Sequence, residues 1–242
     1  MMRSLATAFV AAIAVSAQSA PPDSATILAA AREALGGEKK LSAVKTIVAT
    51  GRTQQVRGNN LVPIEFEIDV ELPDKYVRKD EIPAQESGPS TAGFNGDKLI
   101  RTSPPTVRED FARLMLGLFA TSFAGYPLTL SYVGQAEAPQ GKADVLDAKG
   151  AQNGTMRLFV DRSTHLPIMI TWQAPAPPAR GGQASPPATP QETRLFFADY
   201  RDVDGMKWPF RVRRAQGADT VEETVFDRFK VNARIDAKKF QP

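Results

Sequence analysis

Thr193 to Arg213 read TRLFFADYRDVDGMKWPFRVR, a pattern typical of a strand, a tight turn and a second strand. The turn is predicted at Asp202-Val203-Asp204-Gly205, because Asp accepts bonds from the nearby backbone and Gly adopts positive φ without steric cost. In the second arm, apolar and polar residues alternate with a period of two, so one face is aromatic and the other basic. The aromatic face carries Trp208 and Phe210. We predict an antiparallel hairpin whose aromatic face meets either a packed core or a bound apolar ligand.

The N-terminal segment has the pattern of a secretory signal peptide. Arg3 precedes an apolar run from Leu5 to Ala17, which has the length of a signal-peptide core and is too short to span a bilayer. We predict a signal peptide over residues 1–20, with cleavage after Ala17; a buried N-terminal helix is the alternative. The remaining residues, 23–242, are expected to form one domain of a periplasmic or secreted protein.

Composition excludes several classes of protein. The chain has no cysteine, so an exported form has no disulfides and no cysteine for N-terminal lipid attachment. Its 30 basic and 27 acidic residues leave a net charge of +3 and no basic stripe, so binding of nucleic acid is not indicated. No later apolar run is long enough to cross a membrane. We therefore expect a soluble protein with a self-sufficient core and no transmembrane segment in the mature chain.

A second strand pattern is equally clear in LVPIEFEIDVEL, residues 61–72. Phe66, Ile68 and Val70 belong to an apolar face that alternates with a mostly acidic face, so we expect one side of the sheet to be solvated. An Asn95-Gly96 turn predicts a hairpin within residues 92–101. Further strands are expected over residues 44–57, 75–82, 128–134, 142–149, 155–161, 167–173 and 221–231.

Two helices are expected outside the sheet. Ser24 is predicted to cap a short helix that continues to Leu35. A longer helix is predicted from Thr106 to Phe123, where Thr106 and Glu109 match a capping box. Its broad apolar face comprises Val107, Phe111, Leu114, Met115, Leu118 and Phe119.

These elements predict a mainly β fold of the α+β class. A single antiparallel sheet of about ten or eleven strands curves strongly on itself, because long sheets do not stay flat. The result is an open half-barrel covered by helices, with the helix at Thr106–Phe123 on its concave face. Residues 174–191 are rich in proline and are expected to form a mobile loop, not a domain linker, because the strands on either side look like neighbours in one sheet.

Short motifs along the chain resemble the periplasmic carriers of outer-membrane lipoproteins, the LolA/LolB-like superfamily of lipid-binding proteins. The matching segments are Leu72-Pro73-Asp74-Lys75-Tyr76-Val77-Arg78, Phe94-Asn95-Gly96-Asp97-Lys98-Leu99, the strand and turn from Phe159 to Pro167, and the ending from Asn232 to Phe240. The resemblance implies an open barrel of about eleven strands with a helical lid and an apolar cavity. It assigns no individual binding residue.

Catalytic and metal sites are not indicated. His165 is the single histidine, and it lies in a turn without the orienting partner that a general base needs. One histidine and no cysteine leave zinc without its usual ligands. In the Asp-rich hairpin turn, Tyr200 and Arg211 occupy the positions of the first and last calcium ligands. We predict no enzyme activity, no catalytic residue, no cofactor and no metal.

The apolar side chains of the concave face and of the helix have two interpretations, a packed core or a ligand cavity with a lid. The candidate ligand-binding residues are Phe66, Ile68, Val70, Phe111, Leu114, Met115, Leu118, Phe119, Trp208 and Phe210. The first hypothesis is an exported carrier or binding protein for lipid, or for lipoprotein acyl chains, held on the concave face. The alternative is a non-enzymatic accessory protein that contacts another envelope protein.

Overall fold

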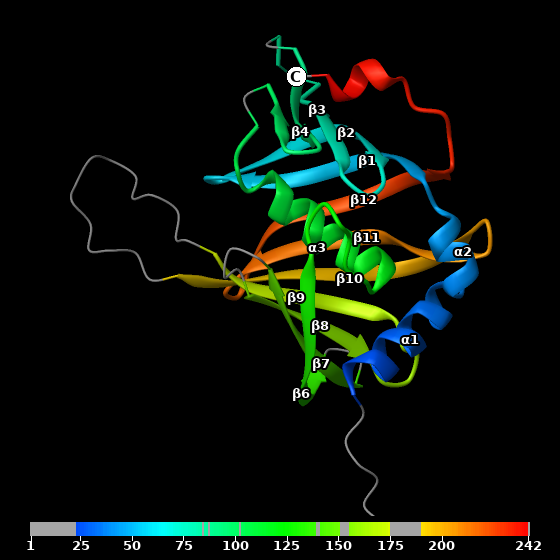
Figure 1. The fold of residues 1–242 in the computed structure, drawn as a ribbon. Helices are drawn as coiled ribbons and strands as arrows, with labels where there is room; N and C mark the ends of the chain where they lie inside the picture. Colours follow the sequence, from blue (N-terminus) through cyan, green and yellow to red (C-terminus); the bar gives the residue numbers. More distant parts are fainter. Residues whose placement is uncertain are drawn as a thin grey trace, which may run out of the picture.

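In the part of the chain that the structure describes, twelve strands form a single antiparallel sheet. The computed structural model describes residues 23–83, 85–86, 88–101, 103–138, 141–150, 155–174 and 190–241. The predicted signal peptide at 1–20 and most of the proline-rich segment at 174–191 lie outside these residues. The strand order is β5-β4-β3-β2-β1-β12-β11-β10-β9-β8-β7-β6, so β5 and β6 are the two edges and the sheet is open. This arrangement confirms the predicted mainly β half-barrel (Figure 1).

Most strands pair with their neighbours in the sequence, and the exception joins the two halves of the chain. β1 pairs with β12, which places the first and last strands side by side at the centre of the sheet. β9 and β10 also pair, with Ala174 opposite Gln191, so the strands that flank the proline-rich segment are neighbours as predicted. The strands are β1 (Thr46–Arg57), β2 (Asn60–Glu71), β3 (Lys75–Glu81), β4 (Ser90–Asn95), β5 (Lys98–Ile100), β6 (Leu128–Ala138), β7 (Gly141–Gly150), β8 (Thr155–Asp161), β9 (Pro167–Ala174), β10 (Gln191–Val203), β11 (Met206–Gln216) and β12 (Asp219–Val231).

The hairpin of β10 and β11 has the predicted turn. Val203 pairs with Met206, and the two residues between them, Asp204 and Gly205, have φ of 56° and 74°. Positive φ at both positions matches the right-handed twist of the two strands. Trp208, on the inner face of β11, is 1% exposed. The aromatic face of the hairpin therefore points into the interior.

The described residues form four helical segments, which differ from the two predicted helices in their number, caps and ends. The first helix is capped by Asp23, whose Oδ1 accepts from the Thr26 amide at 2.7 Å, so Ser24 is its first residue and not its cap. A second helix follows at once and was not predicted from the sequence. The segments are α1 (Ser24–Leu35), α2 (Glu38–Ala43), α3 (Val107–Phe119) and the 3-10 helix η1 (Ala237–Phe240).

The predicted capping box at the start of α3 is wrong. Thr106 already has helical dihedral angles, φ −68° and ψ −11°, so its side chain is not placed to cap and makes no capping hydrogen bond. Glu109 instead accepts a hydrogen bond from Arg113. The helix also ends at Phe119, short of the predicted Phe123, because Ala120 adopts a left-handed conformation.

Helix α3 covers the concave face of the sheet. It belongs to the connection between the two edge strands, β5 and β6, so the chain crosses the concave face to pass from one edge to the other. Figure 1 shows α3 in front of the middle strands, with the sheet curving around it. Gly117 lies against the ring of Phe197 on β10, with no room for a Cβ. This close approach packs the helix directly on the sheet.

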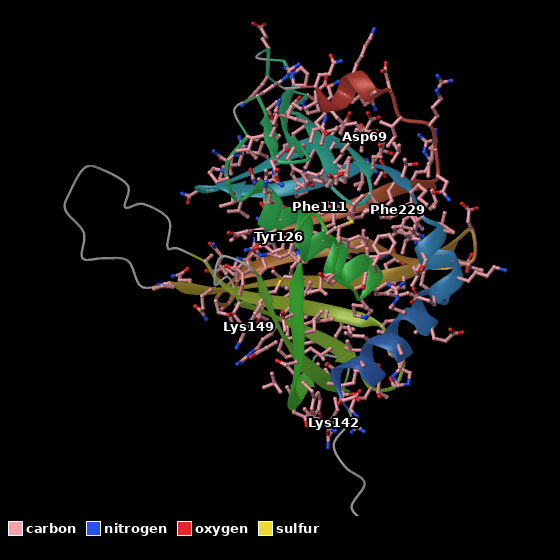
Figure 2. All side chains as sticks on the ribbon, viewed as in Figure 1. Asp69, Phe111, Tyr126, Lys142, Lys149 and Phe229 are labelled. Carbon is pink, nitrogen blue, oxygen red and sulfur yellow. The ribbon has the colours of Figure 1, made fainter. Side chains whose placement is uncertain are left out.

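The outer face of β2 is less solvated than predicted. Asp69 is 3% exposed, because the C-terminal segment lies over it (Figure 2). Lys239 Nζ donates to both carboxylate oxygens of Asp69, at 2.9 and 2.8 Å, and to Glu67 Oε1 at 2.7 Å. Burial raises the pKa of Asp69 although Lys239 opposes the shift, whereas the hydrogen bond from Lys239 lowers the pKa of the more exposed Glu67. Phe240 fills a small apolar cluster beside this group.

We predict that Gly117→Ala destabilises the protein, although alanine favours helices by about 1 kcal/mol over glycine. The added methyl group would overlap the ring of Phe197. We expect the free energy of unfolding, measured by urea denaturation, to fall by about 1–3 kcal/mol, as for other overpacked cores. In a Phe197→Leu background the same substitution should cost much less, because the two positions are coupled. An equal cost in both backgrounds would contradict this packing.

The concave face and its covering helix

A row of aromatic rings extends from α3 into the sheet. Phe119 on α3 meets Trp208 edge-on, with ring centroids 5.8 Å apart, and Trp208 stacks on Phe229 of β12 at 4.9 Å. Phe229 lies 4.6 Å from Phe226, which meets Phe66 of β2 at 5.4 Å. Phe229 is labelled on the sheet in Figure 2. The row joins the helix to strands from both halves of the chain.

A second aromatic cluster lies at the first turns of α3. Phe111, labelled in Figure 2, packs against Tyr76 of β3 at 5.6 Å and against Phe94 of β4 at 5.1 Å. Burial raises the pKa of Tyr76, so its hydroxyl stays protonated. The Arg108 guanidinium lies 4.5 Å from the centroid of Phe94 and donates to the carbonyl of Gly96. Aromatic contacts therefore hold the helix at both of its ends.

The structure brings the ten candidate ligand-binding residues into one cluster. Nine of them are buried in the main core, and Leu114 is half-buried against it. In this conformation the apolar face of α3 occupies the concave face and packs as core. Their contact with a ligand stays a prediction, which the packed conformation of the helix does not test.

The ion pair at the C-terminal end of α3 was not predicted from the sequence. Arg32 on α1 donates from Nη1 to the carbonyl oxygen of Phe119 at 2.7 Å, and from Nη2 to Glu38 Oε1 at 2.8 Å. A cation at the C-terminus of a helix complements the helix dipole and an unpaired carbonyl. The hydrogen bond from Arg32, supported by Ser42, lowers the pKa of Glu38 to about 2. No local sequence signal connects residues 32 and 119, which meet only in the folded chain.

A polar group at the other end of α3 was also missed. Arg113 is 8% exposed and donates to Glu109 Oε2 at 2.7 Å and to Asp110 Oδ1 at 3.1 Å. Its guanidinium lies 4.2 Å from the ring centroid of Trp172 on β9. Arg214 on β11 approaches Asp110 at 3.7 Å. The periodic spacing of apolar residues in a helix does not predict a buried arginine on its apolar side.

Two open clefts differ in their position and in their walls. One cleft of about 580 Å³ adjoins the start of α3, and its walls include Leu99, Pro105, Arg108 and Tyr126. Tyr126 is labelled in Figure 2, where it lies near α3. A second cleft, of about 470 Å³, has mostly charged and polar walls from β1, β2 and β3, Arg52 and Glu65 among them. The first cleft therefore opens beside the apolar helix, and the second is polar.

The lone histidine lies in an exposed turn. His165 has a φ of 58° and donates its amide hydrogen to the Asp161 carbonyl at 2.8 Å. Asp161 Oδ1 accepts four bonds from Ser163 and Thr164, so this carboxylate organises the turn between β8 and β9. Within the described residues, no group of three or more His, Asp or Glu side chains is placed to hold a metal ion. The helices of that same part of the chain are all too short or too polar to cross a bilayer.

We predict that Glu38→Gln changes the acid dependence of stability. In the folded protein Glu38 has a pKa of about 2, below its ordinary value of 4.5. Its contribution to the free energy of unfolding is therefore complete above pH 4.5 and is lost as the pH falls towards 2. The stability difference between the wild type and Glu38→Gln, from urea denaturation, should therefore shrink over that range. The exposed neighbour Glu33, changed to Gln, is the control. A difference that is constant from pH 6 to pH 2 would contradict the assignment.

Comparison with known proteins gives matches in structure. No protein-family model matches the chain, and no curated protein matches its sequence. A LolA superfamily protein from Nitrosomonas europaea has a TM-score of 0.54 and 14% identity, with 92% of this chain and 99% of that chain covered. A provisionally named outer membrane lipoprotein-sorting protein domain from Vibrio parahaemolyticus has a TM-score of 0.53 and 11% identity, with coverages of 90% and 97%.

A DUF1329 family protein from Desulfovibrio piger matches with a TM-score of 0.52 and 9% identity, over 90% of this chain and 96% of that chain. At such identities the likeness concerns the fold alone. The open twelve-stranded sheet with a helix across its concave face agrees with the resemblance noted in the sequence. The chain has a LolA-like fold.

Proposed function

We propose that the protein is an exported carrier or binding protein for lipid or for lipid-modified protein. An apolar ligand lies against the concave face of the sheet, and α3 acts as a lid that the ligand displaces. The observation that carries the proposal is the burial of one helix, through its apolar face, on the concave side of an open LolA-like sheet. Binding, not catalysis, is the activity that such an apolar surface provides.

The sheet does not depend on α3 for its backbone hydrogen bonds. Every strand pairs with other strands, and the helix is attached through side chains and through the connections at its two ends. Displacement of α3 therefore breaks no strand ladder. An acyl chain that takes its place restores apolar contact on the concave face, at about 0.8 kcal/mol for each methylene group removed from water. Because the acyl chain replaces the apolar contacts that α3 gives up, the helix can leave the concave face at a low net cost in free energy.

The side chains of the lid suit ligands of varied shape. Met115 and the two phenylalanines Phe111 and Phe119 form much of its buried face. Methionine is flexible and polarisable, so it adapts to different apolar surfaces. The solved structure from Vibrio parahaemolyticus is named for lipoprotein sorting, which supports acyl chains as the ligand class. The signal-peptide pattern of residues 1–20 supports a periplasmic site of action.

Extraction tests the carrier directly. Mature protein purified from the envelope of its own organism is extracted with organic solvent, and the extract is analysed by mass spectrometry. We expect an acyl lipid at close to one molecule for each protein. We also expect added long-chain lipid to raise the melting temperature of delipidated protein, because a ligand that binds only the folded state stabilises it. Absence of both effects would reject the carrier.

Substitutions in the lid and in the sheet should change affinity in opposite directions. Leu118→Ala weakens the docking of α3, and buried Leu→Ala changes cost about 2–5 kcal/mol. A larger fraction of molecules with α3 displaced raises the apparent affinity for an apolar ligand. We therefore expect dodecanol to bind at least about tenfold more tightly to this variant. Phe210→Ala removes part of the sheet wall and should weaken binding by about tenfold. The two tryptophans contact α3 side chains, so intrinsic fluorescence measures the binding.

Leu61→Ala is the matched control, because Leu61 is an exposed leucine of β2 outside the core cluster. It should leave the affinity unchanged. Equal losses of affinity in Leu118→Ala and Phe210→Ala would show that α3 is part of a permanent core and would contradict the lid.

A further inference from the structure

A pocket of about 200 Å³ lies where the first turns of α3 meet the ends of three strands on the concave side. Its walls come from α3, β9, β10 and β11, and they include Asp110, Arg113, Trp172, Thr193 and Arg214. Trp172 forms an apolar wall between two guanidinium groups, with Arg113 at 4.2 Å and Arg214 at 6.0 Å from its ring centroid. The pocket therefore combines cations with an aromatic surface.

Arg214 has unused hydrogen-bonding capacity. Its closest charged contact is Asp110, at 3.7 Å, and among the described residues it makes no side-chain hydrogen bond. Asp110 Oδ1 already accepts from Arg113, so the two arginines share one carboxylate oxygen. An arginine presents five N–H donors in a rigid fork that matches an oxyanion. Arg214 is thus a partly buried cation whose buried Nε has no acceptor among the described residues.

Two further donors in the same walls lack acceptors. Both terminal nitrogens of Arg113 are engaged by carboxylates, but its buried Nε has no partner among the described residues. Thr193 is 1% exposed, and its hydroxyl also has none there. Four buried side-chain polar atoms are without a partner in the described part of the chain, and three belong to these walls; the fourth is Nε1 of Trp208. Buried donors without acceptors are costly, so their clustering calls for an explanation.

We infer that this pocket binds an oxyanion, a carboxylate or a phosphate, as the polar end of an acyl ligand. The inference deepens the proposed function and rests on it for the acyl chain. The oxyanion accepts hydrogen bonds from Arg214 on β11 and from the Thr193 hydroxyl on β10, two unpartnered donors that stay on the sheet when the ligand displaces α3. The first methylene groups lie against the ring of Trp172. When α3 leaves, Arg214 loses its distant contact with Asp110 and forms a direct bond to the oxyanion instead.

The test compares three probes on the mature protein by isothermal titration calorimetry: dodecyl phosphate, dodecanol and inorganic phosphate. We expect dodecyl phosphate to bind at least about tenfold more tightly than dodecanol, as for a charge-assisted hydrogen bond. Arg214→Gln should remove this preference and leave the affinity for dodecanol unchanged. Such a result separates the headgroup site from the apolar site.

Arg213→Gln is the matched control. Arg213 precedes Arg214 on β11 but faces the outer side of the sheet, where it lies over Phe196 and bonds to Thr220. The Arg213→Gln substitution removes the same charge, and the preference for dodecyl phosphate over dodecanol should stay within about twofold of the wild-type value. Thr193→Val removes the unpartnered hydroxyl with little change of shape. This variant should not lower the melting temperature of the free protein, and it should weaken dodecyl phosphate several-fold.

The outcomes distinguish the two proposals. Binding of inorganic phosphate that is lost in Arg214→Gln, without binding of either dodecyl compound, would support the oxyanion site and reject the acyl carrier. Equal affinities for dodecanol and dodecyl phosphate would overturn the oxyanion site and leave the carrier standing. A preference for phosphate that persists in Arg214→Gln would also overturn the site, and so would a failure of all three probes to bind.

Discussion

An open sheet of one layer has an apolar inner face that something must cover. In this chain the concave face carries aromatic and branched side chains from almost every strand, and burial of that surface is the main stabilising term. Helix α3 supplies the cover, and it does so from the connection between the two edge strands. The helix therefore contributes to stability mainly through packing, while the strand ladders hold the sheet. Its docking is separable from the sheet's own hydrogen bonding.

This separation explains how one surface serves both as core and as a proposed binding face. The row of rings from Phe119 to Phe66 passes through Trp208 and Phe229 without a break. A ligand chain that replaces the helix meets the same rings, so the sheet gains no new exposed surface. Displacement of α3 costs free energy for two reasons. The apolar face of the helix becomes exposed, and close contacts such as that of Gly117 with Phe197 are lost. The balance between these terms decides whether the face stays closed.

Periodic and local features of the fold were predictable from the sequence. Alternation in residues 61–72 and the turn at Asp204-Gly205 depend on neighbours in the chain, and both form as expected. Contacts between distant residues were not predictable. Lys239 covers Asp69 from 170 residues away, so an acidic face that reads as solvated is partly buried. The pocket at Arg214 likewise forms where α3 meets β9, β10 and β11, and the spacing of these residues along the sequence does not predict it.

The polar groups at the two ends of α3 orient the helix more than they hold it. Arg32 bonds to the last carbonyl of α3, and Glu109 and Asp110 lie in its first turns, so each charge complements the helix dipole. Partly exposed ion pairs of this kind contribute about 0–1 kcal/mol each, less than one buried leucine or phenylalanine. Competition for the concave face is therefore decided by apolar contact. The charges determine which end of an amphipathic ligand lies at Arg214, because among the described residues only that end of α3 offers a cation with an unpartnered buried donor.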